Sequence, residues 1–456
     1  MVHIRLYSSF PSEYSSRGTA YGSNSKIYQD IIGELKQREN KIKEIHLTLY
    51  LFNNAHLYNE LLKLAEKGIG IVVTSLPLAG YDDRKIKEAE NVYEKVIKDH
   101  AIDLLIFPHM YMWYGAQYAG GGASYSLHIK AGMITYKNGT SKVFLTSGNL
   151  APGDPSHSET AVFVEAPRNN TFAKAFEDFF NEIEKRAISF SKYNKLVSKL
   201  PQELDQVFDF SFVGGTRPVN FTSAQTSRAF FTAPFVLIGG KGSNHYARRR
   251  LVKTILSAKR RLLVCAQHCH DIAPFDGYRG QTMIKSIIKA RKKNANLDVR
   301  VLKQVSSSGL ADKRRAAFVE SHLYHAGISQ RVNRLVHDKF VVADDTIILT
   351  TGNFTATQFG WGQRQMEYRT ETRKLKIVEQ IVRSAKNSFA TPKSSIQARM
   401  RYPRKGLPRV KVLRDDIFSE VNAFIVIRKH KVANQIAKYF DDIWSHKLSA
   451  NVEIPM

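Results

Sequence analysis

The chain carries one short pattern twice, and this duplication constrains its fold more than any other feature. One copy reads SLHIKAGMIT and the other LVHDKFVVADD. Of fifteen histidines, only His128 and His337 are followed two residues later by a lysine, Lys130 or Lys339. Residues i and i+2 of a strand point to the same face, so each pair presents an imidazole beside an ammonium group.

The similarity between the two halves extends well beyond these motifs. In both halves a strand, a helix and a second strand precede the His-x-Lys strand, and a further strand after it ends in Thr-(Ser/Thr)-Gly-Asn, at Asn149 and Asn353. A loop, a glutamate, a strand and a helix follow, over residues 158–183 and 365–389. We interpret residues 419–444, another strand and helix, as an extension that packs on the second copy.

The predicted fold class is α/β, with two α/β/α modules related by a pseudo-twofold axis and the active site at their interface. Strands that alternate with helices favour mainly parallel or mixed sheets covered by helices. The 456 residues suffice for two large domains. We place the modules at residues 1–205 and 220–456, with a linker near residues 200–226 that contains Gly and Pro.

Charge indicates the class of partner. The 68 Lys and Arg residues exceed the 41 Asp and Glu residues, which leaves a formal charge of +27 and favours a polyanion. Nucleic acid is the first candidate and an anionic membrane surface the second. The N-terminal sequence has no secretory or transit pattern, no stretch is apolar enough to span a membrane, and the only two cysteines suit a reducing compartment. The expected location is therefore the cytoplasm or the nucleus.

A cleft that gathers both copies holds two imidazoles, two ammonium groups and two amides. Cleavage of a phosphodiester needs a nucleophile, a proton donor for the leaving alkoxide, and cationic or N–H donors around the phosphoryl oxygens. Histidine suits the first two roles because its unperturbed pKa lies near neutrality. Neither copy alone completes this set, so the duplication itself predicts a shared site.

The two motifs resemble the signature of the phospholipase D superfamily, His-x-Lys-x4-Asp in each of two repeats. His337, Lys339 and Asp344 match it fully, whereas Thr135 stands where the first repeat would have its Asp. The missing Asp, with TSGNL and TTGNF, is similar to the tyrosyl-DNA phosphodiesterase and nuclease branches. The retained Asp344 is less like the tyrosyl-DNA phosphodiesterase branch, and we expect it to brace its strand.

The resemblance implies a mechanism without a metal or another cofactor. One histidine forms a covalent phosphohistidine, the other protonates the leaving group, and water releases the product. By position His128 is the nucleophile and His337 the general acid, although near-symmetry leaves the reverse order open. The remaining catalytic candidates are Lys130, Lys339, Asn149 and Asn353, which hold the phosphate, and Glu159 and Glu367, which orient the imidazoles or are merely solvated or capping residues.

Other segments are candidates for substrate binding. The loop HMYMWYGAQYAGGGASYS contains Tyr111, Trp113, Tyr114 and Tyr118, which suit stacking on bases or on a tyrosyl adduct, or pack as an ordinary surface loop. His268 is expected at the rim of the cleft. Together with His270 it has the spacing of two metal ligands, but no third ligand is evident, so we expect no metal.

Basic clusters gather in the second half of the chain. We interpret them as a surface beside the cleft that follows a nucleic-acid backbone, with lipid headgroups or plain solvent as alternatives. They span residues 247–253, 258–261, 290–294, 312–315 and 399–411.

Together these features predict a metal-independent phosphodiesterase that acts on nucleic acid, either as a nuclease or in DNA repair on adducts at a DNA 3′ end. DNA is favoured over RNA, and a single strand or an end over an intact duplex; no obligate protein partner is inferred. The alternative enzyme is a phospholipid hydrolase or transphosphatidylase. A non-catalytic binding protein on the same fold is the alternative from another class.

Overall fold

The structure is a computed structural model of the whole chain. It describes residues 2–10, 26–76, 83–107, 127–152, 157–192, 218–233, 235–270, 282–305, 310–355 and 420–452, and of residues 83–86 and 310–315 the backbone alone.

The first half of the chain forms a sheet of eight strands in the order β1-β7-β6-β5-β2-β3-β4-β8. Neighbouring strands pair antiparallel except in the run β2-β3-β4, which is parallel. The strands are β1 His3–Ser9, β2 Ile42–Leu49, β3 Gly70–Ser75, β4 Asp103–Ile106, β5 Ala131–Tyr136, β6 Thr140–Thr146, β7 Glu159–Pro167 and β8 Ile188–Ser189.

The second half forms another eight-stranded sheet, in the order β10-β20-β18-β17-β13-β15-β16-β21. Here too the pairing is antiparallel except in one parallel run of three strands, β13-β15-β16. The strands are β10 Ala229–Thr232, β13 Arg261–Ala266, β15 Asp298–Lys303, β16 Ser329–Val332, β17 Lys339–Ala343, β18 Thr346–Thr350, β20 Asn422–Arg428 and β21 Ala450–Asn451.

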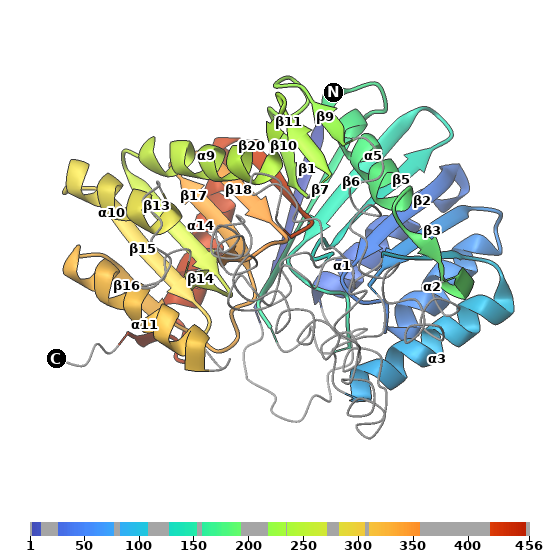
Figure 1. Cartoon of the computed structure of the whole chain (residues 1–456), viewed down its shortest axis with the longest axis horizontal. Helices are drawn as coiled ribbons and strands as arrows, with labels where there is room; N and C mark the ends of the chain where they lie inside the picture. Colours follow the sequence, from blue (N-terminus) through green and yellow to red (C-terminus); the bar gives the residue numbers. More distant parts are fainter. Residues whose placement is uncertain are drawn as a thin grey trace, which may run out of the picture.

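The two sheets have the same sequence of parallel and antiparallel pairings from one edge to the other. The two His-x-Lys motifs lead into β5 and β17, which are the fourth strands of the two orders. This correspondence confirms the predicted α/β class with two repeated modules. Figure 1 shows the modules side by side, the first in blue to green and the second mainly in yellow to red.

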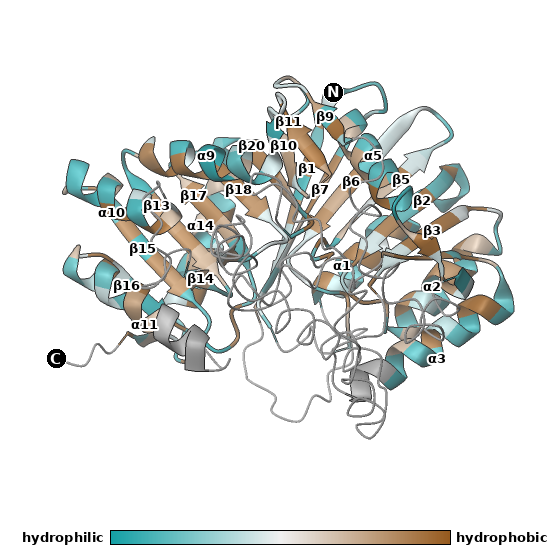
Figure 2. Ribbon diagram, viewed as in Figure 1, coloured by the Kyte–Doolittle hydropathy of each residue, from teal (hydrophilic) through white to brown (hydrophobic). Residues whose placement is uncertain are grey.

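Helices cover the sheets. Their outer faces are hydrophilic, whereas the strands are largely hydrophobic (Figure 2). The helices are α1 Lys26–Lys36, η2 Glu39–Lys41, α2 Ala55–Ala65, α3 Asp83–Asp99, α5 Thr171–Glu184, α9 Ser243–Leu256, α10 Met283–Lys293, α11 Leu310–His325 and α14 His430–Trp444.

Helix α5 shows why the modules adhere to each other. Asn170 caps its N-terminus by accepting a hydrogen bond from the backbone of Phe172 at 3.0 Å. Phenylalanines at helical spacing then line one face, and Phe179 stacks on Phe231 of β10 with ring centroids 4.1 Å apart. One hydrophobic core therefore runs from the first sheet through α5 into the second sheet, while a separate core lies under α1, α2 and α3.

Strand β20 has a more central place than the extension that the sequence suggested. It lies between β18 and β10, as β7 lies between β6 and β1, and α14 follows it as α5 follows β7. The strand and helix that complete the second repeat in the described part of the chain are therefore β20 and α14. Residues 365–389, which the sequence placed there, lie outside the described residues.

Small elements connect the modules. Strands β9 Val219–Phe221, β11 Val236–Ile238 and β12 Lys241–Gly242 form a three-stranded sheet, and β14 Cys269–His270 pairs with β19 Phe354–Thr355. The predicted linker lies partly here, and its residues 200–217 lie outside the described residues. Among the helices that the structure describes, none is both long and apolar enough to cross a membrane.

Candidate active site

Each His-x-Lys segment is held by a strand of the other module. In the first motif the backbone N–H of His128 donates to the carbonyl of Val421 at 3.0 Å, and Leu127 forms a parallel bridge with Val421. In the second motif Ser158 forms the corresponding bridge with Val336. The two motifs therefore meet at the interface between the modules, as the sequence predicted.

The turns that end β6 and β18 are built alike. Gly148 and Gly352 each donate a backbone N–H at 3.1 Å to a threonine hydroxyl two residues earlier. The next hydroxyls, those of Ser147 and Thr351, each accept from the backbone of the adjacent strand, at Thr160 and Ala423. These contacts fix the correspondence between the halves, residue by residue.

His337 has a carboxylate partner from the opposite module. Its Nδ1 lies 2.7 Å from Oε1 of Glu159, the first residue of β7, and its backbone N–H donates to the hydroxyl of Ser158 at 3.2 Å. The second carboxylate oxygen of Glu159 accepts from the hydroxyl of Ser147. Glu159 is fully buried and therefore not a solvated residue, and its contact with His337 is the geometry that the predicted orienting role requires; the role itself stays a prediction.

His128 has a different environment. Its Nδ1 lies 3.8 Å from Oε2 of Glu420, which is longer than a hydrogen bond, and its ring meets Tyr50 edge to face with centroids 5.2 Å apart. Asn422 is close enough to raise the pKa of His128, while Nδ1 of His128 has no hydrogen-bond partner among the described residues. Neither Glu420 nor Asn422 was singled out by the sequence, because they follow Asn353 at a much greater distance than Glu159 follows Asn149.

The two motif lysines are fully buried. The ammonium group of Lys130 lies 3.5 Å from the carbonyl of Thr351 in the other module and 5.2 Å from the ring centroid of Tyr50. The ammonium group of Lys339 donates to the carbonyl of His337 at 2.6 Å. Both lysines act electrostatically on both histidines, so the four side chains share one site.

Burial and positive charge govern protonation here. Burial is the main cause that lowers the pKa of both His128 and His337, and Lys130 and Lys339 lower these pKa values further. Burial raises the pKa of Glu159, and it raises that of Glu420 to about 7. Because raised pKa values favour the neutral acid form of these two glutamates, they balance the two buried ammonium groups only in part. The electrostatics of the site therefore favour binding of an anion.

Further polar groups stand around the pair. Asn149 and Asn353 end the two matched turns and are half-buried, and Oδ1 of Asn353 has no hydrogen-bond partner among the described residues. The ring of His157 lies 5.4 Å from that of His337, and His268 acts on the pKa of His337. His268 is thus near the site, as expected. His157 was not predicted, because the second half of the chain has no histidine at the matching position.

Comparison with known proteins agrees with this geometry. Residues 251–388 match the family described as "Cardiolipin synthase, PLD-like domain". Phosphatidylserine synthase of Haemophilus influenzae Rd KW20 matches 98% of the chain and 87% of its own length, with 9% identity and a TM-score of 0.50. Such a score at this identity indicates a shared fold. Within the second half of the chain, residues 251–388 therefore match a phospholipase D-like domain.

Two other structures resemble the chain more weakly. A yeast tyrosyl-DNA phosphodiesterase mutant matches 95% of this chain and 89% of its own, with 11% identity and a TM-score of 0.44. The polyphosphate kinase of Porphyromonas gingivalis matches 97% of this chain with 9% identity and a TM-score of 0.46, and this chain spans only 50% of its length. No curated protein sequence matches the chain.

The Asp that matches the phospholipase D signature has a structural role in this chain. The carboxylate of Asp344 accepts backbone N–H groups from three consecutive residues, Lys259 at 2.9 Å, Arg260 at 2.8 Å and Arg261 at 3.1 Å. Asp344 itself has a φ of 53°, in the left-handed region that Asp tolerates better than most residues. It thus braces the start of β13, at the end of the sheet away from Lys339.

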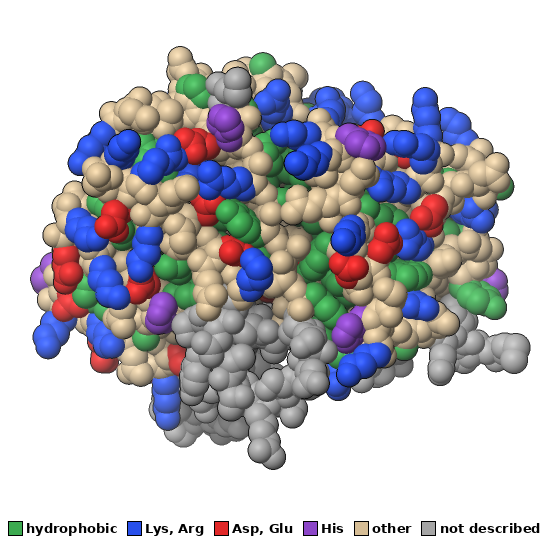
Figure 3. All heavy atoms as spheres, turned by 180° about the vertical axis from the view of Figure 1, so that it is seen from behind, with side chains coloured by type: hydrophobic (Ala, Val, Ile, Leu, Met, Phe, Trp, Pro, Cys, Tyr) green, Lys and Arg blue, Asp and Glu red, His purple; other side chains and the backbone are tan. Residues whose placement is uncertain are grey.

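The basic clusters lie partly elsewhere than the sequence predicted. In the register of β13 with β17, Leu262 pairs with Ala343 and Ala266 with Lys339, so residues 258–261 lie at the far end of the sheet from the motif. Asn294 hydrogen-bonds to the carbonyl of Lys259, which places the end of α10 there too. Lys and Arg side chains are spread widely over the face seen in Figure 3, with Asp and Glu side chains among them.

Several predicted residues lie outside the described part of the chain. They are Glu367, the loop residues Tyr111, Trp113, Tyr114 and Tyr118, the basic side chains of 312–315, and the cluster 399–411. Within the described residues, no three His, Cys, Asp or Glu side chains gather as a metal site would need, and the pair His268 and His270 gains no third ligand there.

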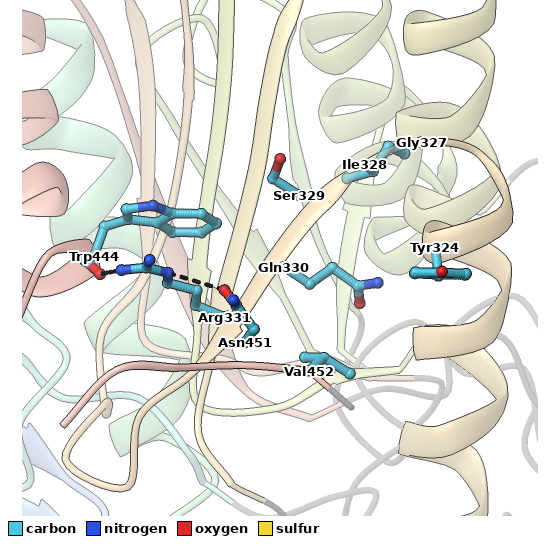
Figure 4. A pocket seen from close by; sticks show the side chains of 9 residues that line it. All are labelled: Tyr324, Gly327, Ile328, Ser329, Gln330, Arg331, Trp444, Asn451 and Val452. Atoms are coloured by element: carbon cyan, nitrogen blue, oxygen red, sulfur yellow. Dashed lines mark hydrogen bonds between the residues drawn. The ribbon is translucent and has the colours of Figure 1, made fainter. Parts of the chain in front are cut away.

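A cavity of about 580 Å³ lies away from the motifs, at the outer edge of the second sheet (Figure 4). Arg331 crosses it between the carbonyl of Trp444 and the side chain of Asn451. Tyr324 and Gln330 form part of its wall. None of the predicted site residues lines this cavity.

Proposed function

We propose that this protein is a phosphodiesterase of the phospholipase D type that acts on nucleic acid through a covalent phosphohistidine and needs no metal ion. One observation carries the proposal: the two His-x-Lys pairs converge at the module interface, where Lys130 reaches Thr351 and His337 contacts Glu159. Each pair alone lacks either the nucleophile or the acid, and together they have both.

The side chains supply what the reaction requires. Nδ1 of His337 faces Glu159 and Nδ1 of His128 faces Glu420, so the Nε2 atom of each ring is the one turned away from its carboxyl partner. One Nε2 attacks phosphorus while the other gives its proton to the leaving oxygen. Lys130, Lys339 and the amides of Asn149 and Asn353 neutralise the phosphoryl oxygens, which is the role that a metal ion has in other phosphodiesterases.

Charge and surface chemistry support nucleic acid over lipid as the substrate. A formal charge of +27 favours a long polyanion. Among the described residues, the exposed large hydrophobic side chains are only Ile97, Val305 and Tyr324, fewer than a surface that inserts into a membrane would use. We infer a single strand or a DNA end as substrate, in a nuclease or a repair enzyme that removes 3′ adducts; a cytoplasmic or nuclear location stays a prediction.

The test is cleavage of a 5′-labelled single-stranded oligonucleotide, with and without a 3′-phosphotyrosine, in the presence of EDTA. The wild type should release product, and His128→Ala and His337→Ala should not. Loss of tyrosine from the end would identify an adduct-processing enzyme, and internal fragments a nuclease. A wild type that is inactive in EDTA and recovers with a divalent cation would contradict the proposed chemistry.

A phospholipid substrate is the second candidate, because the matching family is described as a cardiolipin synthase domain and one structure of similar fold is a phosphatidylserine synthase. The same two-histidine chemistry transfers a phosphatidyl group when an alcohol takes the place of water. Vesicles of an anionic phospholipid, with and without glycerol, form the second arm of the experiment. Turnover of vesicles without turnover of any oligonucleotide would overturn the nucleic-acid proposal and leave the phosphohistidine chemistry in place.

A further inference from the structure

The two halves of the site are not equivalent, and we propose that this difference assigns the two histidine roles. His337, hydrogen-bonded to Glu159, is the nucleophile, and His128, which lies beside Asn422 and Glu420 without a hydrogen bond from Nδ1 to any described residue, is the general acid. This inference rests on the proposed two-histidine chemistry. It reverses the order that the positions of the motifs along the chain suggested.

The assignment begins with the correspondence of Glu159 to Asn422. Thr160 and Ala423 make the same contact to the matched turn hydroxyls, so the residues that precede them occupy the same position in the two halves. The turn hydroxyl of Ser147 then donates to Glu159, and that of Thr351 donates to Oδ1 of Asn422 at 2.7 Å. One half therefore has a carboxylate where the other has an amide.

A carboxylate at Nδ1 suits the nucleophile. When Glu159 accepts the Nδ1 proton of His337 at 2.7 Å, the lone pair of the ring lies on Nε2, the atom that attacks phosphorus. The phosphorylated ring is cationic, and the buried carboxylate stabilises that charge as it forms. The contact between Glu159 and Ser147 holds the carboxylate in place for this role.

An amide suits the general acid. Oδ1 of Asn422 accepts a hydrogen bond from Thr351, and Nδ2 of Asn422 donates one to Glu420 at 3.2 Å. The neutral amide therefore cannot balance the positive charge of the His128 ring as a carboxylate would. An imidazolium without a close carboxylate gives up its proton more readily, which favours transfer to a leaving alkoxide. The Glu420 carboxyl, 3.8 Å from Nδ1, is the nearest acidic group to this ring.

Other charged groups act on the two rings similarly. His128 faces Lys130, Lys339 and His337, and His337 faces Lys339, His157, Lys130 and His268. These groups lie on several elements but all lower the pKa of the ring that they face. The carboxyl partners are thus the feature that separates the two histidines.

The reaction balances with these roles. Nε2 of neutral His337 forms a bond to phosphorus as the bond from phosphorus to the leaving oxygen breaks, and that oxygen takes the Nε2 proton of His128, which the bound phosphodiester anion holds in its cationic form. In the second step the neutral His128 takes a proton from water as the water oxygen bonds to phosphorus. The bond between phosphorus and His337 then breaks, which returns both rings to their starting states.

Covalent trapping on a substrate with an activated leaving group tests the assignment. The probe is a 5′-labelled oligonucleotide with a 3′-(4-nitrophenyl) phosphodiester, whose phenolate leaves without a proton. His128→Ala should still release nitrophenolate in a burst and carry the label on His337, located by mass spectrometry of the digested protein. His337→Ala and His337→Gln should show neither a burst nor a label. Circular dichroism checks that each variant is folded.

Two substitutions of matched shape and opposite charge change test the positioning residues. Glu159→Gln should lower the burst rate by about 100-fold or more, comparable to neutralising the carboxylate of a catalytic triad. Asn422→Asp should change the burst rate less than about tenfold and should move the basic limb of the pH–rate profile for an unactivated substrate to higher pH, because a carboxylate stabilises the acid form of His128. A merely structural role for either residue would change stability and leave the profile where it is.

The outcomes separate this inference from the proposed function. A label on His128, with His337→Ala retaining the burst, would overturn the assignment and leave the two-histidine chemistry intact. Equal effects of Glu159→Gln and Asn422→Asp on the burst would also overturn it. A wild type that neither cleaves nor becomes labelled with any oligonucleotide would contradict the proposed function itself.

Discussion

The two modules have the same arrangement of the backbone around the site, but several of the side chains there differ. Both present a His-x-Lys pair with a fully buried lysine beside a matched turn, and both hold the motif of the partner module through the backbone. The matched positions that differ include Glu159, Ile129 and Thr135 in the first half, which correspond to Asn422, Asp338 and Asp344 in the second. The proposed phosphate-binding residues are thus duplicated, while the charged groups around them are not.

This comparison indicates how a duplicated fold supports an asymmetric reaction. Two identical sites would give two histidines with the same tendency to attack and to donate a proton. A single exchange of carboxylate for amide behind one ring separates the roles without moving the backbone.

The largest effect should come from the motif lysines, which occupy equivalent positions. Lys130→Met and Lys339→Met should each lower kcat/KM by about 100- to 1000-fold, as loss of one donor to a developing charge does elsewhere. Lys142→Met is the matched control: this lysine is equally buried but pairs with Glu34 at 2.7 Å, away from the motifs. Its effect should fall on thermal stability, with kcat/KM of the folded protein within about threefold. Unequal losses from the two motif lysines would show that the halves also differ in phosphate binding.

Much of this arrangement was predictable because duplication makes it visible. The motifs, the turns that end in Asn149 and Asn353, and the α/β class follow from local patterns that recur. Glu159 was also found, since it opens a strand soon after its turn. These features depend on short-range spacing, which a single sequence preserves.

The rest depends on contacts between distant segments. Asn422 lies 71 residues from its partner Thr351, so no local pattern identifies it. The position of β20 inside the sheet follows from its pairing with β10 and β18, and a sequence of strand character fits an edge as well as an interior. The sequence shows that the basic clusters belong to the second half of the chain, but it does not show at which end of a strand they lie. They were therefore predicted beside the cleft.

Asp338 should make stability depend on pH. It lies between His337 and Lys339, is fully buried, and accepts from the hydroxyl of Tyr439 at 2.9 Å, while Ile129 occupies the matched position. Burial raises the pKa of Asp338 to about 7. A raised carboxyl pKa stabilises the fold below the unfolded pKa, near 4, and this contribution is lost as the pH rises through about 7.

When the pH is raised from 4 to 8, the free energy of unfolding of Asp338→Asn should therefore rise relative to that of the wild type by about 2 to 4 kcal/mol. Urea unfolding at both pH values measures this difference. Glu159 and Glu420, whose pKa values are raised, and His128 and His337, whose pKa values are lowered, titrate in the wild type and the variant alike, so their contributions cancel in the difference between the two proteins. Asp298→Asn, at an exposed carboxyl, is the control and should leave the difference near zero. A variant whose stability ran parallel to that of the wild type would show that Asp338 does not titrate in this range.

Asp344 should affect stability and leave catalysis unchanged. Asp344→Ala removes the acceptor for three backbone N–H groups and should cost about 1 to 2 kcal/mol in urea unfolding. Asp344→Asn keeps one oxygen and tolerates the positive φ, so it should cost about half as much. Both variants should keep kcat/KM within about twofold at 25 °C. A large loss of activity in a stable Asp344→Asn protein would mean that the signature Asp acts on the reaction.

The smallest effect should come from the basic residues at the far end of the second sheet. Lys292 and Lys293 are exposed at the end of α10, where Asn294 contacts Lys259. From Leu262 to Ala266 the strand alone covers about 13 Å, so a phosphate held by Lys339 lies well away from them.

Lys292→Gln with Lys293→Gln should change kcat/KM on a short oligonucleotide by less than about twofold. The dependence of binding on salt should also be unchanged, because a contact to phosphate at both lysines would lower its slope by about 1.4 for a single strand. A lower slope with a long strand but not with a short one would mean that the substrate continues around the second module, and the comparison between the two ends of that sheet would then describe one extended binding path.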